Sequence, residues 1–122
     1  DMIHKFLEQL GRKAFLGGNI GTPVCDYQES EYIVLELSSY QLESIKDFRA
    51  DVSVLTNLFP NHLERYDNKL ENYRKAKLKI VDNLKGEDFL IVNENFKLYD
   101  SIKNFYFKKT KILNLVALVS FI

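Results

Sequence analysis

The chain has 122 residues, which fits one domain and allows a hydrophobic core without disulfide or metal cross-links. A composition of 46% hydrophobic and 28% charged residues excludes a disordered or fibrous protein. Seventeen basic and seventeen acidic residues cancel, so no net charge draws the chain toward nucleic acid or an anionic membrane. A single cysteine, no run of apolar residues long enough for a membrane span and no signal-peptide pattern favour a cytoplasmic protein.

The two ends of the chain are unlike natural termini. The sequence opens on Asp1 directly in a helical pattern, and residues 112–122 are almost entirely apolar. Natural termini are usually polar and exposed. We therefore expect this chain to be a piece of a larger protein.

The first third of the chain predicts one helix and two strands. Residues 2–10 follow the helical period, and Gly11 supplies a stop. Residues 13–16 form a short strand candidate, interrupted by two glycines. Residues 31–38 contain the clearest strand, whose near-continuous hydrophobicity is typical of a parallel strand buried on both faces.

The rest of the chain continues the alternation of strands and helices. Strands are expected at 51–57 and 89–92, with a long amphipathic helix at 68–84 between them. A short helix at 95–102 and strands at 105–107 and 112–115 complete the pattern. This alternation predicts βαβ units, and therefore an α/β fold with a mostly parallel sheet.

Glu36 is a carboxylate inside the most hydrophobic strand. A buried carboxylate is unfavourable unless it is paired or binds a cation. Glu36 and Ser38 are two residues apart and project from one face near the carboxyl end of the strand, where open α/β sheets bind ligands. The pair could hold Mg²⁺ and a phosphate-bearing substrate; alternatively, Glu36 pairs with a lysine or marks a strand end that reaches solvent.

The segment 57–66 follows another strand and presents Asn61, His62 and Arg65 in a turn after Pro60. A neutral imidazole is a good ligand for a divalent cation, and a guanidinium binds phosphate or carboxylate. A structural or merely exposed histidine is the alternative.

Lys77 lies at the centre of the apolar stripe of the helix at 68–84, whereas Lys75 and Lys79 lie off it. A lysine in this position must snorkel to water, pair, or lose its charge. A neutral amine could act as a nucleophile, form a Schiff base, or react with CO₂ to form a carbamate.

The segment 17–23 is rich in glycine and carries Asn19, which could read a carbonyl or hydroxyl of a ligand. It is not a phosphate loop, and the pattern G-x-x-x-x-G-K-[ST] occurs nowhere in the 122 residues.

Taken in order, these segments resemble the central domain of the Mur ligases, the ATP-dependent amide ligases of peptidoglycan synthesis in bacteria. The resemblance covers residues 2–93, whereas 94–122 match poorly. The run at 35–43 favours the branch of the family that adds D-glutamate to UDP-N-acetylmuramoyl-L-alanine. The resemblance to the family rests on four stretches: GNIG at 18–21, LELSSYQLE at 35–43, NHLERY at 61–66 and YRKAKLKI at 73–80.

The resemblance implies roles for matching positions. Glu36 would bind the Mg²⁺ that bridges the ATP phosphates, and His62 would help bind a second Mg²⁺. Lys77 matches a lysine that is carbamylated in the family and assists the second metal. Asn19, Ser38 and Gln41 would line the site for the UDP-muramoyl substrate; Asn61 and Arg65 would support it.

The resemblance also implies a chemistry and a fold. ATP would phosphorylate the substrate carboxylate to an acyl phosphate, and the amine of D-glutamate would displace phosphate. The fold would be a three-layer, mostly parallel sheet with helices on both faces, as in P-loop NTPases, but incomplete because the P-loop strand is not in the chain.

The sequence departs from the family pattern in two ways. Asn61 stands where the family normally has Asp, which removes a negative charge beside the metals. The P-loop, the N-terminal domain for the uridine nucleotide and the C-terminal domain for the incoming amino acid have no counterpart in the chain. We therefore expect the chain alone to be inactive. A degenerate remnant, a non-catalytic binding domain of the same ancestry, and a folylpolyglutamate synthase relative are the alternatives; the motif at 35–43 argues against the last.

Overall fold

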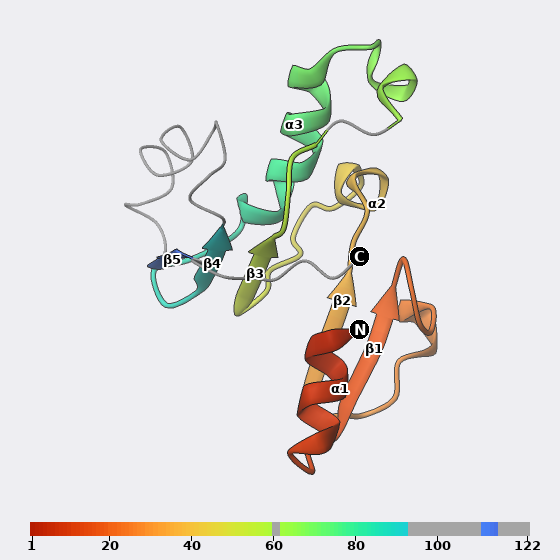
Figure 1. Ribbon diagram of the computed structural model, residues 1–122, viewed down its shortest axis with the longest axis vertical. Coiled ribbons are helices and arrows are strands. Elements are labelled where there is room, and N and C mark those ends of the chain that lie inside the picture. The colour runs from red at the N-terminus through yellow and green to blue at the C-terminus, as the bar shows by residue number, and fades with distance from the viewer. Residues whose placement is uncertain (60–61, 93–110, 115–122) are drawn as a thin grey trace. The chain divides into compact units, whose positions relative to one another are not determined.

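The computed structural model describes residues 1–59, 62–92 and 111–114 (Figure 1). The chain forms two compact units, Asp1–Gln41 and Leu42–Ile122. The expected helix at 95–102 and the expected strand at 105–107 lie outside the described residues. No helix in the described part of the chain is both long and apolar enough to cross a bilayer.

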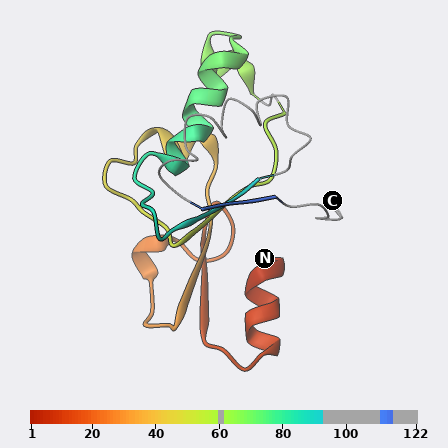
Figure 2. The ribbon, with the colours of Figure 1, turned by 90° about the vertical axis from the view of Figure 1, so that its left-hand side faces the viewer.

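The first unit is a parallel two-stranded ribbon with a helix beside it. Its elements are α1 (Met2–Gln9), β1 (Ala14–Gly18), η1 (Val24–Asp26) and β2 (Tyr32–Glu36). The two strands run parallel from the Ala14–Tyr32 pair to the Gly18–Glu36 pair. Helix α1 lies along one face of the ribbon (Figures 1 and 2), where His4 Nε2 is 3.0 Å from the Ala14 carbonyl oxygen. The expected first helix and first two strands are thus confirmed, although β1 continues through Gly17 and Gly18, which were expected to interrupt it.

The prediction that β2 is buried on both faces is wrong for this structure. Tyr32 and Ile33 are 44% and 54% exposed, and Glu36 is also exposed. The reason is that Asp1–Gln41 offers β2 a single strand partner, β1, and one long helix, too little to cover both faces. Continuous hydrophobicity identified the strand correctly but not its burial.

The second unit contains a parallel three-stranded sheet in the order β3-β4-β5. The parallel pairing confirms the sequence prediction. A single sheet with helices on both faces remains a prediction. The elements that follow β2 are α2 (Ser39–Glu43), β3 (Val52–Leu55), η2 (Leu63–Tyr66), α3 (Leu70–Leu78), η3 (Lys79–Val81), β4 (Phe89–Val92) and β5 (Lys111–Asn114).

The long helix expected at 68–84 is shorter than predicted. It is α-helical only over Leu70–Leu78 and then tightens into the 3₁₀ turn η3. The tighter turn leads the chain under the sheet, where Val81 is 1% exposed and Leu84 is 6% exposed. Short 3₁₀ turns are common at the ends of helices, and hydrophobic periodicity does not distinguish them from α-helix.

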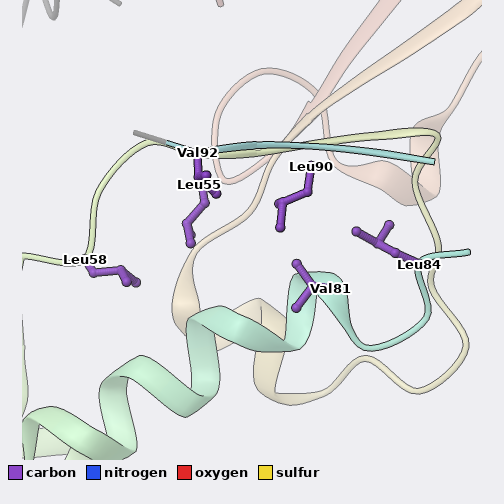
Figure 3. Packing of buried hydrophobic residues seen from close by; sticks show 6 residues of the cluster. All are labelled: Leu55, Leu58, Val81, Leu84, Leu90 and Val92. Atoms are coloured by element: carbon purple, nitrogen blue, oxygen red, sulfur yellow. The ribbon is translucent and has the colours of Figure 1, made fainter. Parts of the chain in front are cut away.

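The main core of this unit lies between the sheet and the η3 end of the helix. Figure 3 shows that side chains from β3 and β4 point toward those of the helical segment. Each fully buried aliphatic side chain of this kind contributes about 1.5–3 kcal/mol through apolar burial. The cluster consists of Leu55, Leu58, Val81, Leu84, Leu90 and Val92.

Ser53 lies in β3 beside this core and is 2% exposed. Its hydroxyl has no hydrogen-bond partner among the described residues. Burying a hydroxyl without a partner is unfavourable. Removal of the hydroxyl should therefore stabilise the folded state.

We expect Ser53→Ala to raise the free energy of unfolding by about 1 kcal/mol, because the alanine methyl fits the same space without a desolvated hydroxyl. Equilibrium unfolding in urea measures this change. Ser44→Ala is the control, since Ser44 is exposed and its replacement should have little effect. A clear loss of stability in Ser53→Ala would mean that the hydroxyl is satisfied.

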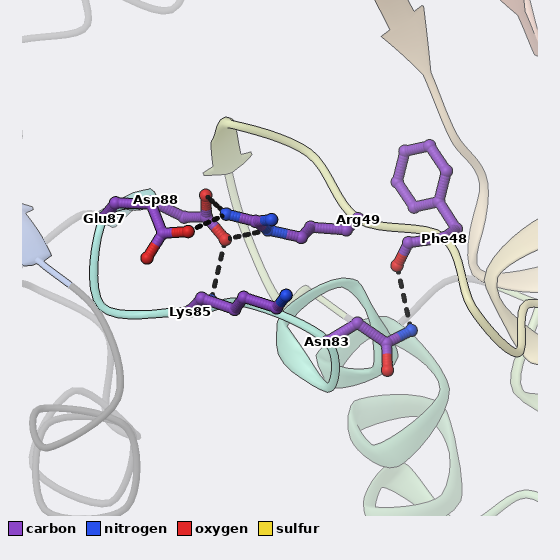
Figure 4. Close-up of polar contacts among 6 residues, drawn as sticks. All are labelled: Phe48, Arg49, Asn83, Lys85, Glu87 and Asp88. Atoms are coloured by element: carbon purple, nitrogen blue, oxygen red, sulfur yellow. Dashed lines mark hydrogen bonds and ion pairs between the residues drawn. The ribbon is translucent and has the colours of Figure 1, made fainter.

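A polar anchor joins the segment before β3 to the turn before β4 (Figure 4). Arg49 Nε and Nη2 each donate to a carboxylate oxygen of Asp88 at 2.7 Å, and Nη2 also donates to Glu87 Oε1 at 2.6 Å. The Lys85 amide donates to Asp88 at 2.7 Å, and Asn83 Nδ2 donates to the Phe48 carbonyl at 2.9 Å. These bonds satisfy Asp88, which is 1% exposed.

The Arg49 hydrogen bond, helped by the Lys85 amide, lowers the pKa of Asp88 below its ordinary value of 3.8. The two carboxylates raise the pKa of Arg49. A carboxyl whose pKa is lower in the folded state stabilises the fold fully above its unfolded pKa. That contribution disappears as the pH falls through the folded pKa.

We therefore expect the chain to lose stability as the pH falls below 3.8, and Asp88→Asn to lose less over that range because it has no charge to neutralise. Asp88→Asn should also be less stable than the wild type at neutral pH, since it leaves Arg49 without its main partner. Urea unfolding across a pH series measures both effects. Parallel pH profiles for the two proteins would contradict the assignment.

Candidate functional site

Asn19 and Glu36 lie together at the carboxyl ends of β1 and β2. The register pairs Gly18 with Glu36, and the Asn19 amide donates to the Glu36 carbonyl at 2.7 Å. Gly18 has φ +104°, and a Cβ at this position would lie 2.3 Å from the Glu36 carbonyl oxygen. Only glycine permits this approach. At Gly18 the absence of a side chain therefore allows close approach to the neighbouring strand.

The Glu36 side chain is exposed at this edge rather than buried in the strand. Among the described residues, the structure gives its carboxylate no ion-pair partner. Of the alternatives that the sequence left open, pairing with a lysine is therefore not seen. An accessible carboxylate of this kind is a suitable oxygen ligand for Mg²⁺.

Ser38 and Gln41 bind each other across the first turn of α2. Gln41 Oε1 accepts from the Ser38 amide at 3.0 Å and from the Ser38 hydroxyl at 3.1 Å, and the Gln41 amide donates to Ser38 Oγ at 3.2 Å. This reciprocal arrangement is a capping box. The spacing Ser-x-x-Gln carries that signal, which predicts the helix start that the sequence analysis missed.

His62 lies at the start of η2, with an exposed side chain and a left-handed backbone (φ 52°). Its Nδ1 is 3.4 Å from Glu64 Oε1. Arg65 Nη2 is 3.4 Å from Glu43 Oε2. Asn61 lies outside the described residues.

The Lys77 side chain is held by two groups of its own unit. Its Nζ donates to the Asn57 carbonyl at 3.2 Å and lies 5.2 Å from the centre of the Tyr73 ring. Lys77 is half-buried, and Asn57 lies just after the carboxyl end of β3, which ends at Leu55. Of the three possibilities for a lysine on the apolar stripe, the structure thus shows pairing. Tyr73 precedes Lys77 by four residues in α3, a spacing that places both on one face of the helix, whereas the Asn57 carbonyl is a partner that the sequence did not identify.

The predicted site residues fall into two groups. Asn19, Glu36, Ser38 and Gln41 lie in the first unit, and His62, Arg65 and Lys77 lie in the second. Within the described residues, no three His, Cys, Asp or Glu side chains form a group that could hold a metal ion.

The His62 turn and the Lys77 helix are joined by a small hydrophobic cluster separate from the main core. It consists of Tyr66, Tyr73 and Ala76, with Leu63 and Leu70 packed against it. The Tyr66 and Tyr73 rings meet edge to face, with centroids 5.6 Å apart and an interplanar angle of 77°. Such pairs contribute beyond simple area burial.

Comparison with known proteins gives one consistent family. The sequence model described as the Mur ligase middle domain matches residues 1–115. Similar proteins include the UDP-N-acetylmuramoylalanine–D-glutamate ligases of Cytophaga hutchinsonii (42% identical over 105 residues) and Christiangramia forsetii (39% over 100 residues). These alignments cover 84% and 80% of this chain but only 23% and 22% of the relatives.

A solved structure supports the same fold. The MurF ligase of Thermotoga maritima in complex with ADP superposes with a TM-score of 0.68 at 23% identity. The match covers 92% of this chain and 28% of that protein. The chain therefore spans less than a third of the length of each protein to which it is compared here.

Proposed function

The chain belongs to the Mur ligase family, and from this membership we propose that it supplies the metal- and substrate-binding part of a D-glutamate ligase. The reaction would join D-glutamate to UDP-N-acetylmuramoyl-L-alanine at the expense of ATP. The observation that carries this choice of substrate is the 42% identity over 105 residues to a ligase of that name.

The proposed reaction has two steps. The terminal carboxylate of the UDP-muramoyl substrate attacks the γ-phosphorus of ATP, forming an acyl phosphate and releasing ADP. The amine of D-glutamate then attacks the acyl carbon, loses a proton and expels inorganic phosphate. Both steps move negative charge between oxygens, so catalysis depends on positioning and on positive charge near those oxygens.

Glu36 and His62 would each help to hold a different magnesium ion. The Glu36 carboxylate is accessible at a strand end, and oxygen is the ligand that Mg²⁺ prefers. The carboxylate of Glu64 near Nδ1 would orient the His62 ring and leave Nε2 for the cation, as carboxylates commonly do for metal-binding histidines. When bound, Mg²⁺ would neutralise charge on the phosphoryl and acyl oxygens.

Lys77 would serve as a carbamate. Its amine attacks CO₂ and loses a proton, which creates an N–C bond and a negative carboxylate at the end of the side chain. The carbamate nitrogen keeps one hydrogen, so the hydrogen bond to the Asn57 carbonyl is compatible with the modified residue. The new carboxylate would then supply oxygen atoms that the unmodified lysine lacks.

Asn19, Ser38 and Gln41 would line the substrate site. The capping box uses Gln41 Oε1, which leaves the Nε2 donors of the same side chain for a substrate oxygen. The Asn19 side chain is exposed at the strand edge that also carries Glu36. Arg65, paired with Glu43, would support the His62 turn.

A second candidate is a non-catalytic domain of the same ancestry, whether a degenerate remnant or a binding domain. Asn61 favours it, because the neutral amide replaces a carboxylate beside the proposed metals. Under this alternative, restoring the charge with Asn61→Asp would not produce activity.

A chimera distinguishes the two candidates. Residues 1–115 of this chain would replace the matching middle segment of the Cytophaga hutchinsonii ligase. Release of phosphate that requires both D-glutamate and UDP-N-acetylmuramoyl-L-alanine is the measurement. We expect the chimera to turn over and the 122-residue chain alone to be inactive, because the chain contains no phosphate loop.

Point variants of the chimera test the proposed residues. Lys77→Ala should lower kcat about 100-fold or more, since it removes the carbamate that would help to hold the second Mg²⁺. Lys75→Ala is the matched control, because Lys75 is exposed two residues earlier in α3 and should tolerate the change. An inactive chimera that Asn61→Asp does not activate would favour the non-catalytic candidate.

A further inference from the structure

The η2 turn (Leu63–Tyr66) is bracketed by residues in a left-handed conformation. His62, Asp67 and Asn68 have φ of 52°, 53° and 54°. A non-glycine residue in this region is strained by roughly 1–2 kcal/mol, although Asn, Asp and His tolerate it better than others. Three such residues around one short turn require contacts that hold the turn in place.

Tyr66 makes those contacts. It is 6% exposed, and its ring meets the Tyr73 ring edge to face. Its carbonyl accepts from the Lys69 amide at 2.9 Å and from Asn72 Nδ2 at 3.3 Å. Tyr66, the last residue of η2, therefore anchors the turn to the start of helix α3 through both its side chain and its backbone.

Tyr73 carries the link onward to Lys77. The same ring that meets Tyr66 also lies 5.2 Å from Lys77 Nζ, a cation–π contact in the unmodified lysine. The proposed carbamate would retain this nitrogen but not its positive charge. A shift of the Tyr66 ring would change the packing of the Tyr73 ring, and with it the surface on which Lys77 rests. The contacts thus form a continuous series from the His62 turn to the lysine side chain.

We propose that Tyr66 is a positioning residue that sets the place of both His62 and Lys77. It acts through the η2 backbone on one side and through Tyr73 on the other. The inference rests on the proposed function, because the two residues matter to a reaction only if they serve the ligase. The geometric part of the inference does not need the activity.

The geometric part is tested by NMR on the 122-residue chain labelled with ¹³C in lysine. Protons above an aromatic ring face are shielded, so the Lys77 ε-methylene resonance should be shifted upfield in the wild type. Tyr66→Leu keeps an apolar side chain but removes the ring, and should move this resonance toward the position of the exposed Lys75. Tyr66→Phe keeps the ring and should retain the upfield shift.

The control is Leu84→Ala, which weakens the main core but is outside the Tyr66 cluster and distant in sequence from Asn57. It should lower stability without moving the Lys77 resonance. If Tyr66→Leu does not fold, Asn72→Ala removes only the 3.3 Å bond to the Tyr66 carbonyl and should give a smaller shift in the same direction. An unchanged Lys77 resonance in folded Tyr66→Leu, or in Asn72→Ala where Tyr66→Leu does not fold, would overturn the inference.

The functional part is tested in the chimera described above. Tyr66→Leu should lower kcat by about 10-fold or more, as for residues that orient a metal ligand, with little change in KM for the UDP-muramoyl substrate. Tyr66→Phe, which keeps the ring, should have a kcat close to that of the unsubstituted chimera. An inactive wild-type chimera would refute the proposed function alone, and an active Tyr66→Leu chimera with unchanged kcat would refute the positioning role alone.

Discussion

Parallel strand pairing determines which residues meet at the carboxyl ends of the strands. Every described strand pair is parallel, so the carboxyl ends of neighbouring strands meet at one edge within each unit. Asn19 and Glu36 are adjacent for this reason, since β1 and β2 end in register at Gly18 and Glu36. Asn57, whose carbonyl accepts a hydrogen bond from Lys77 Nζ, follows the carboxyl end of β3 in the same way.

In the second unit, one hydrophobic cluster packs the sheet and another supports the residues of the proposed site. The larger cluster packs η3 against β3 and β4, and the Arg49–Asp88 anchor lies beside the turn that enters β4. The smaller cluster around Tyr66 and Tyr73 holds the turn and the helix that carry His62 and Lys77. This division allows the elements of the proposed site to be strained while the fold is stabilised elsewhere.

The sequence predicted the order, type and parallel pairing of the described strands, because hydrophobic runs alternating with helical patterns allow few other arrangements. It also identified Lys77 as unusual from its place on the apolar stripe. It left open whether Glu36 is buried or reaches solvent, because burial depends on which elements cover a strand. It could not reveal the Asn57 partner of Lys77 either, since that bond is a tertiary contact, whereas the Tyr73 contact is an i,i+4 pair within α3.

We propose that Lys77 works as a carbamate when the chain is part of a ligase of this family. NMR of the chimera labelled with ¹⁵N in lysine and supplied with ¹³C-bicarbonate, ATP and Mg²⁺ tests this role directly. A carbamate carbon coupled to one lysine nitrogen is expected, and it should be absent from the Lys77→Arg variant. A chimera that turns over at the rate of its parent with no such signal would rule out the carbamate.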